Sequence, residues 1–213
     1  MDRCRIAIVI PAFNEAATIG SVISSVSQYG KPIVVDDGSS DETSQLASSL
    51  GASVVGHAVN RGYDQAINSG FVRAEELDCE YVITIDADGQ HDPSLLLRFI
   101  GSLDSGADVV IGVRDRCQRL AEHIFAWVAE KKWGIQDPLC GMKAYRIGLY
   151  KEVGHFDSYG SIGTELALYA AKNGKRIVQL PVKIRERIDA PRFGRIFSAN
   201  RRILYALWVG LLR

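Results

Sequence analysis

Short apolar runs alternate with longer amphipathic segments along the first half of the chain. Five runs have the length of a buried strand, at residues 6–10, 32–37, 52–56, 81–86 and 108–112. In the segments between them, apolar residues recur three or four positions apart, which is typical of helices. This alternation predicts parallel strands joined by crossover helices. We therefore expect a single α/β domain with a mostly parallel, Rossmann-like sheet flanked by helices.

The second half follows the same pattern less regularly. A helix is predicted over residues 120–133, and the glycines and proline that follow it predict a loop and then a short strand. A further helix is expected to stop at Gly174, before a strand-like run over residues 176–184. The chain ends in a predicted amphipathic helix over 196–213. The second half is therefore expected to be mixed α and β rather than regularly alternating.

Composition fits a soluble globular domain and excludes few functional classes. The chain has 213 residues, of which 47% are hydrophobic and 23% charged, enough for one core. Lys plus Arg equal Asp plus Glu at 25 each, so net charge gives no argument for a nucleic-acid partner. Arginines crowd the last thirty residues and predict a basic face there.

Cysteine spacing and hydropathy indicate a cytoplasmic protein. The four cysteines form no C-x-x-C pair, so neither a zinc knuckle nor a disulfide framework is indicated, and reduced thiols are expected. The longest apolar run, over 203–212, is too short to cross a bilayer but could lie on one. The alternative is that this helix simply docks on the core. The sequence thus favours a cytoplasmic location, with possible contact at the inner membrane face.

Acidic residues gather where predicted strands end, which is where open parallel sheets bind ligands. Asp86, Asp88 and Gln90 follow the fourth strand at intervals of two, so on an extended strand end their oxygens would point the same way. Such oxygens suit Mg²⁺ or Mn²⁺, which commonly completes its coordination with substrate phosphates. The alternative is that Asp86 caps a helix and Asp88 is a solvated turn residue. We expect Asp92 to cap the helix at Pro93, and His91 to be an exposed loop residue.

Two further carboxylates follow the second strand. Asp36 could accept a hydrogen bond from a base N–H, and Asp37 could hold a ribose hydroxyl. A tight turn before a helix would explain the neighbouring glycine and serines but not both aspartates. Glu15, after the first strand, could either cap the first helix or reach a ribose.

Four segments, in their order and spacing, resemble a known family. VIPAFNEAATIGSVISSV, VVDDGSSDET, NRGYDQAINSG and YVITIDADGQHDP are similar to the nucleotide-binding half of the family 2 inverting glycosyltransferases of the GT-A fold. The polyprenyl-phosphate sugar transferases of that family are the most similar. The resemblance is strong over about 5–112, the donor half. It implies an acceptor half over about 113–195 and a C-terminal helix over 196–213.

The resemblance also implies roles for individual residues. The residues expected to hold the nucleotide are Pro11, Ala12, Asn14, Glu15, Asp36, Asp37, Gly62, Asp86 and Ala87. The metal would be bound by Asp86, Asp88 and Gln90. The catalytic residues would be Asp137 and Glu165, near the sugar and acceptor, with Arg192 and Arg195 closing over the diphosphate. The chain departs from the family at Asp64, where glycine is common, and in a shortened basic stretch before the acceptor loop.

The expected function is a metal-dependent transfer of a hexose from a UDP- or GDP-sugar to polyprenyl phosphate. A hydroxyl acceptor needs a general base, whereas a lipid phosphate is already anionic. The single acid at Glu165, followed by Leu166, favours the phosphate. A glycan hydroxyl acceptor and a non-catalytic nucleotide-sugar-binding module stay open as alternatives. A nicotinamide dehydrogenase is disfavoured, because the first strand is not followed by G-x-G-x-x-G.

Overall fold

The computed structural model describes residues 5–115, 119–184 and 196–213, and its framework is one mixed sheet of seven strands. The strand order is β3-β2-β1-β4-β6-β5-β7. Every neighbouring pair is parallel except those made by β6, which runs antiparallel to both β4 and β5. The strands are β1 (Ile6–Ala12), β2 (Lys31–Asp36), β3 (Ser53–Gly56), β4 (Tyr81–Thr84), β5 (Val109–Arg114), β6 (Lys143–Arg146) and β7 (Ile177–Val182). The predicted α/β class and the mixed second half are both confirmed.

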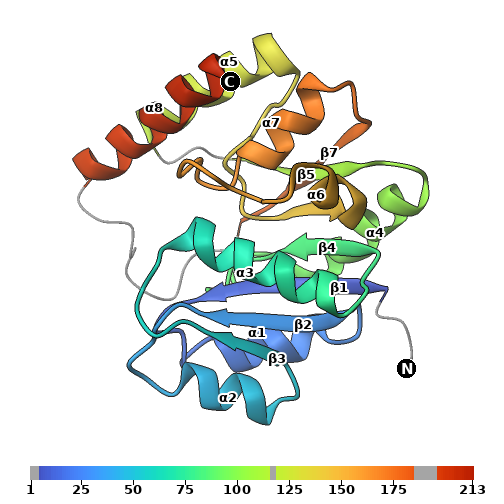
Figure 1. Ribbon diagram of the computed structural model, residues 1–213, viewed down its shortest axis with the longest axis vertical. Coiled ribbons are helices and arrows are strands. Elements are labelled where there is room, and N and C mark those ends of the chain that lie inside the picture. The colour runs from blue at the N-terminus through green and yellow to red at the C-terminus, as the bar shows by residue number, and fades with distance from the viewer. Residues whose placement is uncertain (1–4, 116–118, 185–195) are drawn as a thin grey trace.

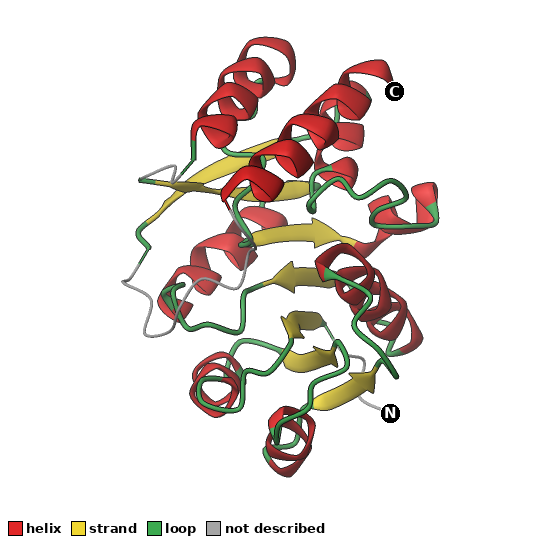
Figure 2. Ribbon diagram, turned by 90° about the vertical axis from the view of Figure 1, so that its left-hand side faces the viewer, coloured by secondary structure: helices red, strands yellow, loops and turns green. Residues whose placement is uncertain are grey.

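Helices cover both faces of the sheet (Figures 1 and 2). They are α1 (Ile19–Val26), α2 (Thr43–Ser49), α3 (Tyr63–Glu76), the 3₁₀ turn η1 (Pro93–Leu95), α4 (Leu96–Asp104), α5 (Leu120–Trp133), α6 (Ile147–Val153), α7 (Glu165–Lys172) and α8 (Ile196–Leu212). Alternate residues of a strand face opposite sides, so β1 contributes to two cores. Ala7 and Val9 pack in the core with α3 and α5 to α8, whereas Ile8 and Ile10 pack in the core with α1, α2 and α4.

Local sequence signals explain where several elements begin and end. Asp92 accepts a hydrogen bond from the Ser94 N–H at 3.0 Å, so it caps η1 just ahead of Pro93 as predicted. Helix α5 ends where Gly134 takes a left-handed conformation with φ 70°, which a residue without Cβ adopts readily. Helix α8 is observed where the amphipathic helix is expected.

Two further findings concern membrane spans and cysteines in the described residues. Within the described residues, no helix is long and apolar enough to cross a membrane. The expectation of reduced thiols is wrong for Cys79, which is disulfide-bonded. Cys140, in contrast, is a free and buried thiol. Spacing along the sequence could not predict the disulfide, because such a bond depends on the approach of two cysteines in space.

Candidate active site

The polar residues that follow β1 and β2 meet at one edge of the sheet. Ala12 pairs with Asp36 at the ends of the two strands, and the Asp37 N–H donates to the Ala12 carbonyl at 2.8 Å. Pro11 and Ala12 are still part of β1. The two loops that leave these strands therefore start side by side, as expected for the carboxyl ends of parallel strands.

Asn14 and Glu15 tie the first of these loops to the second. The Asn14 N–H donates to Ser39 Oγ at 2.8 Å, and Asn14 Oδ1 accepts from the Ser40 N–H at 2.8 Å. Asn14 has φ 54°, a left-handed conformation that asparagine tolerates better than most residues. Glu15 is buried, and its N–H donates to Thr43 Oγ1 at 2.8 Å. These contacts fix the shape of the edge where a nucleotide is expected.

The two aspartates after β2 have different environments. Both oxygens of Asp37 are engaged, since it accepts from the N–H groups of Arg61 and Gly62 at 2.8 Å and lies 2.7 Å from His57 Nδ1. Gly62 has φ 91°, which favours glycine at this position. Asp36 accepts from the Ser39 N–H through Oδ1 at 2.9 Å. Asp37 therefore anchors the loop before α3. Asp36 accepts fewer hydrogen bonds than Asp37.

The segment carrying Asp86 and Asp88 is a turn rather than an extended strand end. Strand β4 stops at Thr84, and the chain turns at Ala87 and Asp88. Gly89 permits this turn with φ 72°, and Asp88 Oδ1 accepts from the Gln90 N–H at 3.0 Å. The predicted strand-like alternation of Asp86, Asp88 and Gln90 is therefore wrong. Asp88 does have the turn geometry of the alternative interpretation.

Gly141 lies directly against the Asp86 carboxylate. A Cβ at Gly141 would clash with Asp86 Oδ2, at a distance that real Cβ contacts do not reach. Thr84 Oγ1 donates to the Gly141 carbonyl at 2.7 Å, which holds the acceptor-half loop against the end of β4. Only a residue without a side chain leaves room for the carboxylate here. The absence of a side chain at Gly141 therefore leaves the space that the Asp86 carboxylate occupies.

His91 is buried beside Asp86, so the expectation of an exposed loop residue is wrong. Its Nε2 lies 3.6 Å from Asp86 Oδ2, and its Nδ1 has no hydrogen-bond partner within the described part of the chain. Burial raises the pKa of Asp86, and the negative charge of Asp88 adds to that effect, while His91 opposes it. A cation at this turn would stabilise both carboxylates in their charged form.

The donor set fits a divalent ion that shares its coordination with a substrate. Asp86 and Asp88 supply hard carboxylate oxygens, the type of ligand that Mg²⁺ and Mn²⁺ prefer. Among the described residues, no three His, Cys, Asp or Glu side chains are grouped to hold a metal ion by themselves. Such a pair leaves most of the coordination sphere to water and phosphate oxygens, which is how Mg²⁺ is usually bound in proteins.

Asp137 is buried in an ion pair with Arg114, a residue that the sequence analysis missed. Arg114 Nε and Nη2 donate to the two oxygens of Asp137 at 2.7 and 2.9 Å, and the Arg114 N–H also donates at 3.1 Å. Glu122 lies 3.4 Å from the same guanidinium. Burial alone would lower the pKa of Arg114, but hydrogen bonding and the charge of Asp137 raise it. The sequence did offer a signal for Arg114, because it is a charged residue at the end of an apolar strand.

Glu165 opens α7 and is already surrounded by donors. It accepts from the Ser158 N–H at 2.6 Å and the Ser158 hydroxyl at 2.8 Å, and His155 Nε2 lies 3.2 Å away. Arg213 Nη1, at the end of α8, is 3.5 Å from Glu165 Oε1. Glu165 therefore fixes the loop before α7 and links it to α8. Arg192 and Arg195, the other predicted catalytic residues, lie outside the described residues.

Asp64, the departure from the family pattern, joins the two halves. It is buried and accepts from the Gly163 N–H at 2.7 Å and the Ile162 N–H at 3.3 Å. Ile162 has φ 57°, a strained conformation for a β-branched residue. Lys143, a buried lysine on β6, donates to the Gly163 carbonyl at 3.1 Å. Both peptide groups of Gly163 are thus held, one by each half, and Asp64 supports the turn before α7.

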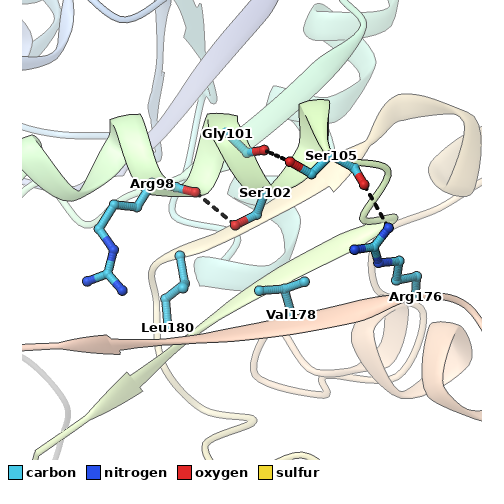
Figure 3. A pocket seen from close by; sticks show the side chains of 7 residues that line it. All are labelled: Arg98, Gly101, Ser102, Ser105, Arg176, Val178 and Leu180. Carbon is cyan, nitrogen blue, oxygen red and sulfur yellow. Dashed lines mark hydrogen bonds between the residues drawn. The ribbon is translucent and has the colours of Figure 1, made fainter.

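A separate hollow of about 340 Å³ lies between α4 and β7 (Figure 3). Arg98 and Arg176 flank it, with Val178 and Leu180 along one side. Arg176 Nη1 donates to the Ser105 carbonyl at 2.7 Å. The residues lining this hollow include none of the predicted site residues. The candidate site is therefore the sheet edge and not this hollow.

The chain is similar to known proteins in sequence and in fold. The model of the family "Glycosyl transferase family 2" matches residues 7–154. The chain is 30% identical over 195 residues to a dolichyl-phosphate hexose transferase of Haloferax volcanii, covering 85% of this chain and 83% of that protein. It is 30% identical over 202 residues to an undecaprenyl-phosphate 4-deoxy-4-formamido-L-arabinose transferase of Edwardsiella ictaluri, covering 85% of this chain and 60% of that protein.

A solved structure shares the fold over nearly the whole chain. It is glucosyl-3-phosphoglycerate synthase from Mycobacterium tuberculosis in complex with Mn²⁺ and UDP-glucose. The TM-score is 0.79 at 25% sequence identity, and the match covers 97% of this chain and 79% of that one.

Proposed function

Because the chain belongs to glycosyl transferase family 2, and is therefore a glycosyltransferase, we propose that it transfers a hexose from a UDP- or GDP-sugar to polyprenyl phosphate. The transfer inverts the anomeric carbon and depends on Mg²⁺ or Mn²⁺. The observation that carries this proposal is the Asp86–Asp88 turn, whose first carboxylate is held against Gly141 at the end of β4. The relatives named for dolichyl-phosphate and undecaprenyl-phosphate transfer support the choice of acceptor.

The donor half is assigned to the nucleotide. Asp36 would accept from a base N–H through Oδ2, because Oδ1 holds the Ser39 N–H and the carboxylate lies at the sheet edge. Asn14, Glu15, Asp37 and Gly62 shape that edge through the hydrogen bonds between loops. The complex of the structural relative with Mn²⁺ and UDP-glucose supports a metal and a nucleotide sugar.

The metal belongs to the Asp86–Asp88 turn. Asp86 and Asp88, with Gln90 beside them, would hold it against the donor diphosphate. A divalent ion bound there would neutralise the charge that develops on the leaving diphosphate. Gly141 leaves room for the Asp86 carboxylate, and Thr84 holds the Gly141 carbonyl beside the end of β4. Arg192 and Arg195 are proposed to stabilise the same leaving group.

The acceptor half favours an anionic nucleophile. A hydroxyl acceptor would need a carboxylate free to take its proton. Asp137 is paired with Arg114, and Glu165 accepts from Ser158 and contacts His155. A phosphate acceptor needs no base, because its oxygen is already charged. Asp137 and Glu165 are then positioning groups that hold the cations and the loop on the acceptor side.

The metal assignment is tested with Asp88→Ala. We expect this variant to lose turnover by at least about a thousandfold, as expected when a metal that stabilises the leaving group is lost, and to lose Mn²⁺ binding in calorimetric titrations. Asp92→Ala is the matched control, because Asp92 is a neighbouring carboxylate that caps η1. Near-normal turnover in Asp88→Ala would exclude the role proposed for the turn.

The acceptor is tested by mass spectrometry of the products from mixed nucleotide sugars, with and without polyprenyl phosphate. We expect a hexosyl polyprenyl phosphate and release of UDP or GDP only when the lipid is present. Transfer to added glycans alone would replace the lipid acceptor. Donor binding without nucleotide release under all conditions would instead identify a non-catalytic module.

A further inference from the structure

Exposed apolar side chains are concentrated on two helices that lie side by side, α5 and α8 (Figures 1 and 2). Of the 13 large hydrophobic residues that are exposed in the described part of the chain, eight belong to these helices. They are Leu120, Ile124 and Trp127 on α5, and Leu204, Tyr205, Trp208, Leu211 and Leu212 on α8. Single exposed apolar residues are ordinary, but a concentration of this size marks an interaction surface.

Each helix buries one stripe and exposes another. On α8, Ala199, Ile203, Ala206 and Leu207 are buried in the core, so docking on the core accounts for one side of the helix only. On α5, Phe125 and Ala129 are buried in the same core. Since the two helices are neighbours and both bury the side facing the core, their exposed stripes face away from the sheet together. We call these two stripes the α5/α8 surface.

The most exposed residues of the α5/α8 surface have the chemistry of a membrane interface. Trp127 and Trp208 are 64% and 58% exposed, and Tyr205 lies beside Trp208 with 6.3 Å between ring centroids. Trp and Tyr are enriched at the level of lipid head groups, because their rings are apolar and their N–H or O–H groups can remain hydrated. Leucines one helical turn away would reach further into the acyl region.

The charges beside these stripes complement an anionic bilayer. The exposed Lys, Arg, Asp and Glu residues on the two helices, among the described side chains, are Lys131, Lys132, Arg201 and Arg202 against Glu130. Basic residues near a bilayer are attracted by anionic lipids. Two copies of the chain docked through this surface would instead bring like charges together. The charge pattern therefore favours a lipid surface over self-association.

We propose that the α5/α8 surface docks the enzyme onto the surface of an anionic lipid bilayer. This deepens the proposed function and rests on it, because polyprenyl phosphate is held in a membrane. Helix α8 is tied to the acceptor side of the site, since Arg213 lies 3.5 Å from Glu165 and Lys172 of α7 donates to the Gly210 carbonyl at 2.8 Å. Docking through α5 and α8 thus holds the acceptor half beside the bilayer.

Vesicle co-sedimentation tests the docking. The vesicles are phosphatidylcholine alone, or phosphatidylcholine with a third replaced by phosphatidylglycerol. We expect stronger binding to the mixed vesicles, and about a tenfold loss of partitioning for each of Trp127→Ser and Trp208→Ser, from the lost burial of one large apolar side chain. Leu97→Ser, which removes a 62% exposed leucine from α4, is the matched control and should bind like the wild type.

A second measurement needs no variant. Brominated lipids in the mixed vesicles should quench the tryptophan fluorescence of the wild-type chain, because Trp127 and Trp208 would lie at head-group depth. Absence of both binding and quenching would overturn the proposal. Loss of binding in Trp208→Ser but not in Trp127→Ser would overturn the two-helix surface. A wild-type dimer in equilibrium sedimentation that both tryptophan variants dissociate would assign the surface to a second copy instead.

A water-soluble acceptor distinguishes a failure of membrane docking from a failure of the proposed acceptor. With a short-chain, water-soluble polyprenyl phosphate, Trp127→Ser and Trp208→Ser should transfer sugar at the wild-type rate, because neither residue belongs to the site. With acceptor in vesicles, both should be slower. Vesicle binding with no transfer to any polyprenyl phosphate would contradict the proposed acceptor and leave the docking surface standing.

Discussion

The donor half and the acceptor half hold their polar residues in different ways. In the donor half, side-chain oxygens accept hydrogen bonds from backbone N–H groups of the loops at the sheet edge, as Asp36 does from Ser39 and Asn14 from Ser40. In the acceptor half, the Asp137 carboxylate is instead paired with the cationic side chain of Arg114. A typical hydrogen bond contributes about 1 kcal/mol and one to a charged group about 1.5–3 kcal/mol, whereas breaking a buried ion pair costs about 3–5 kcal/mol. The donor edge is therefore built from many small contacts and the acceptor side from a few large ones.

The largest expected effect on stability comes from the Arg114–Asp137 pair. Arg114→Met leaves Asp137 buried without its counter-charge, and we expect a loss of about 3–5 kcal/mol in the free energy of unfolding. The double variant Arg114→Met with Asp137→Leu should recover most of that loss, because it removes the unpaired charge at position 137 and Glu122 keeps its ion pair with Arg119 at 3.0 Å. Urea unfolding of both variants measures this. Equal destabilisation by the single and double variants would contradict the pairing argument.

The contact of Gly141 with Asp86, where the acceptor half meets the donor half, is tested with Gly141→Ala. In Gly141→Ala, the new Cβ would displace the Asp86 carboxylate, and we expect at least about a hundredfold loss of kcat/KM, or about 2.7 kcal/mol. Mn²⁺ affinity should fall in parallel. Gly148→Ala is the control, because no atom lies within 4 Å of a Cβ placed there. Wild-type activity in Gly141→Ala would show that the position of Asp86 is not critical.

The sequence could predict the donor half because its contacts join consecutive strand ends. Strand, polar loop and helix follow one another there, so the order of apolar runs is enough to bring Ala12 beside Asp36. The position of β6 between β4 and β5 could not be predicted in this way, since it depends on pairing between distant segments. Arg114 was missed for a similar reason, because its partner Asp137 lies 23 positions further on.

The burial of individual polar residues also could not be predicted from the sequence. His91 follows a turn in a polar segment, and only the packing around Asp86 shows that it is buried. Asp64 differs from the family pattern, yet its contact with Gly163, 99 positions away, gives it a clear structural role.

The contact between Asp64 and Gly163 predicts a pH effect on stability. Burial, together with the charge of Asp157, raises the pKa of Asp64 from 3.8 to about 6, although the Gly163 and Ile162 N–H groups oppose this. The folded state therefore holds the Asp64 proton more tightly than the unfolded state. Its contribution is fully present below about pH 4 and is lost as pH rises through about 6, up to about 3 kcal/mol.

Asp64→Asn removes this titration. The free energy of unfolding of the wild type, relative to that of the variant, should fall between pH 4 and pH 6 and stay constant above pH 7. Glu76→Gln on the exposed side of α3 is the control and should leave the slope unchanged. Parallel pH profiles for the wild type and Asp64→Asn would contradict the assignment.

The smallest expected effect concerns the donor edge. In Ser39→Ala the Asn14 N–H loses the acceptor that holds it at 2.8 Å, and we expect the free energy of unfolding to fall by about 1 kcal/mol. Ser40→Ala removes only a 3.3 Å contact with Asn14 Oδ1 and keeps the Ser40 N–H bond, so it should cost less than about 0.5 kcal/mol. Urea unfolding resolves the two variants. A loss in Ser39→Ala as large as that in Arg114→Met would show that the donor edge, too, depends on a single contact, and the contrast between the halves would fail.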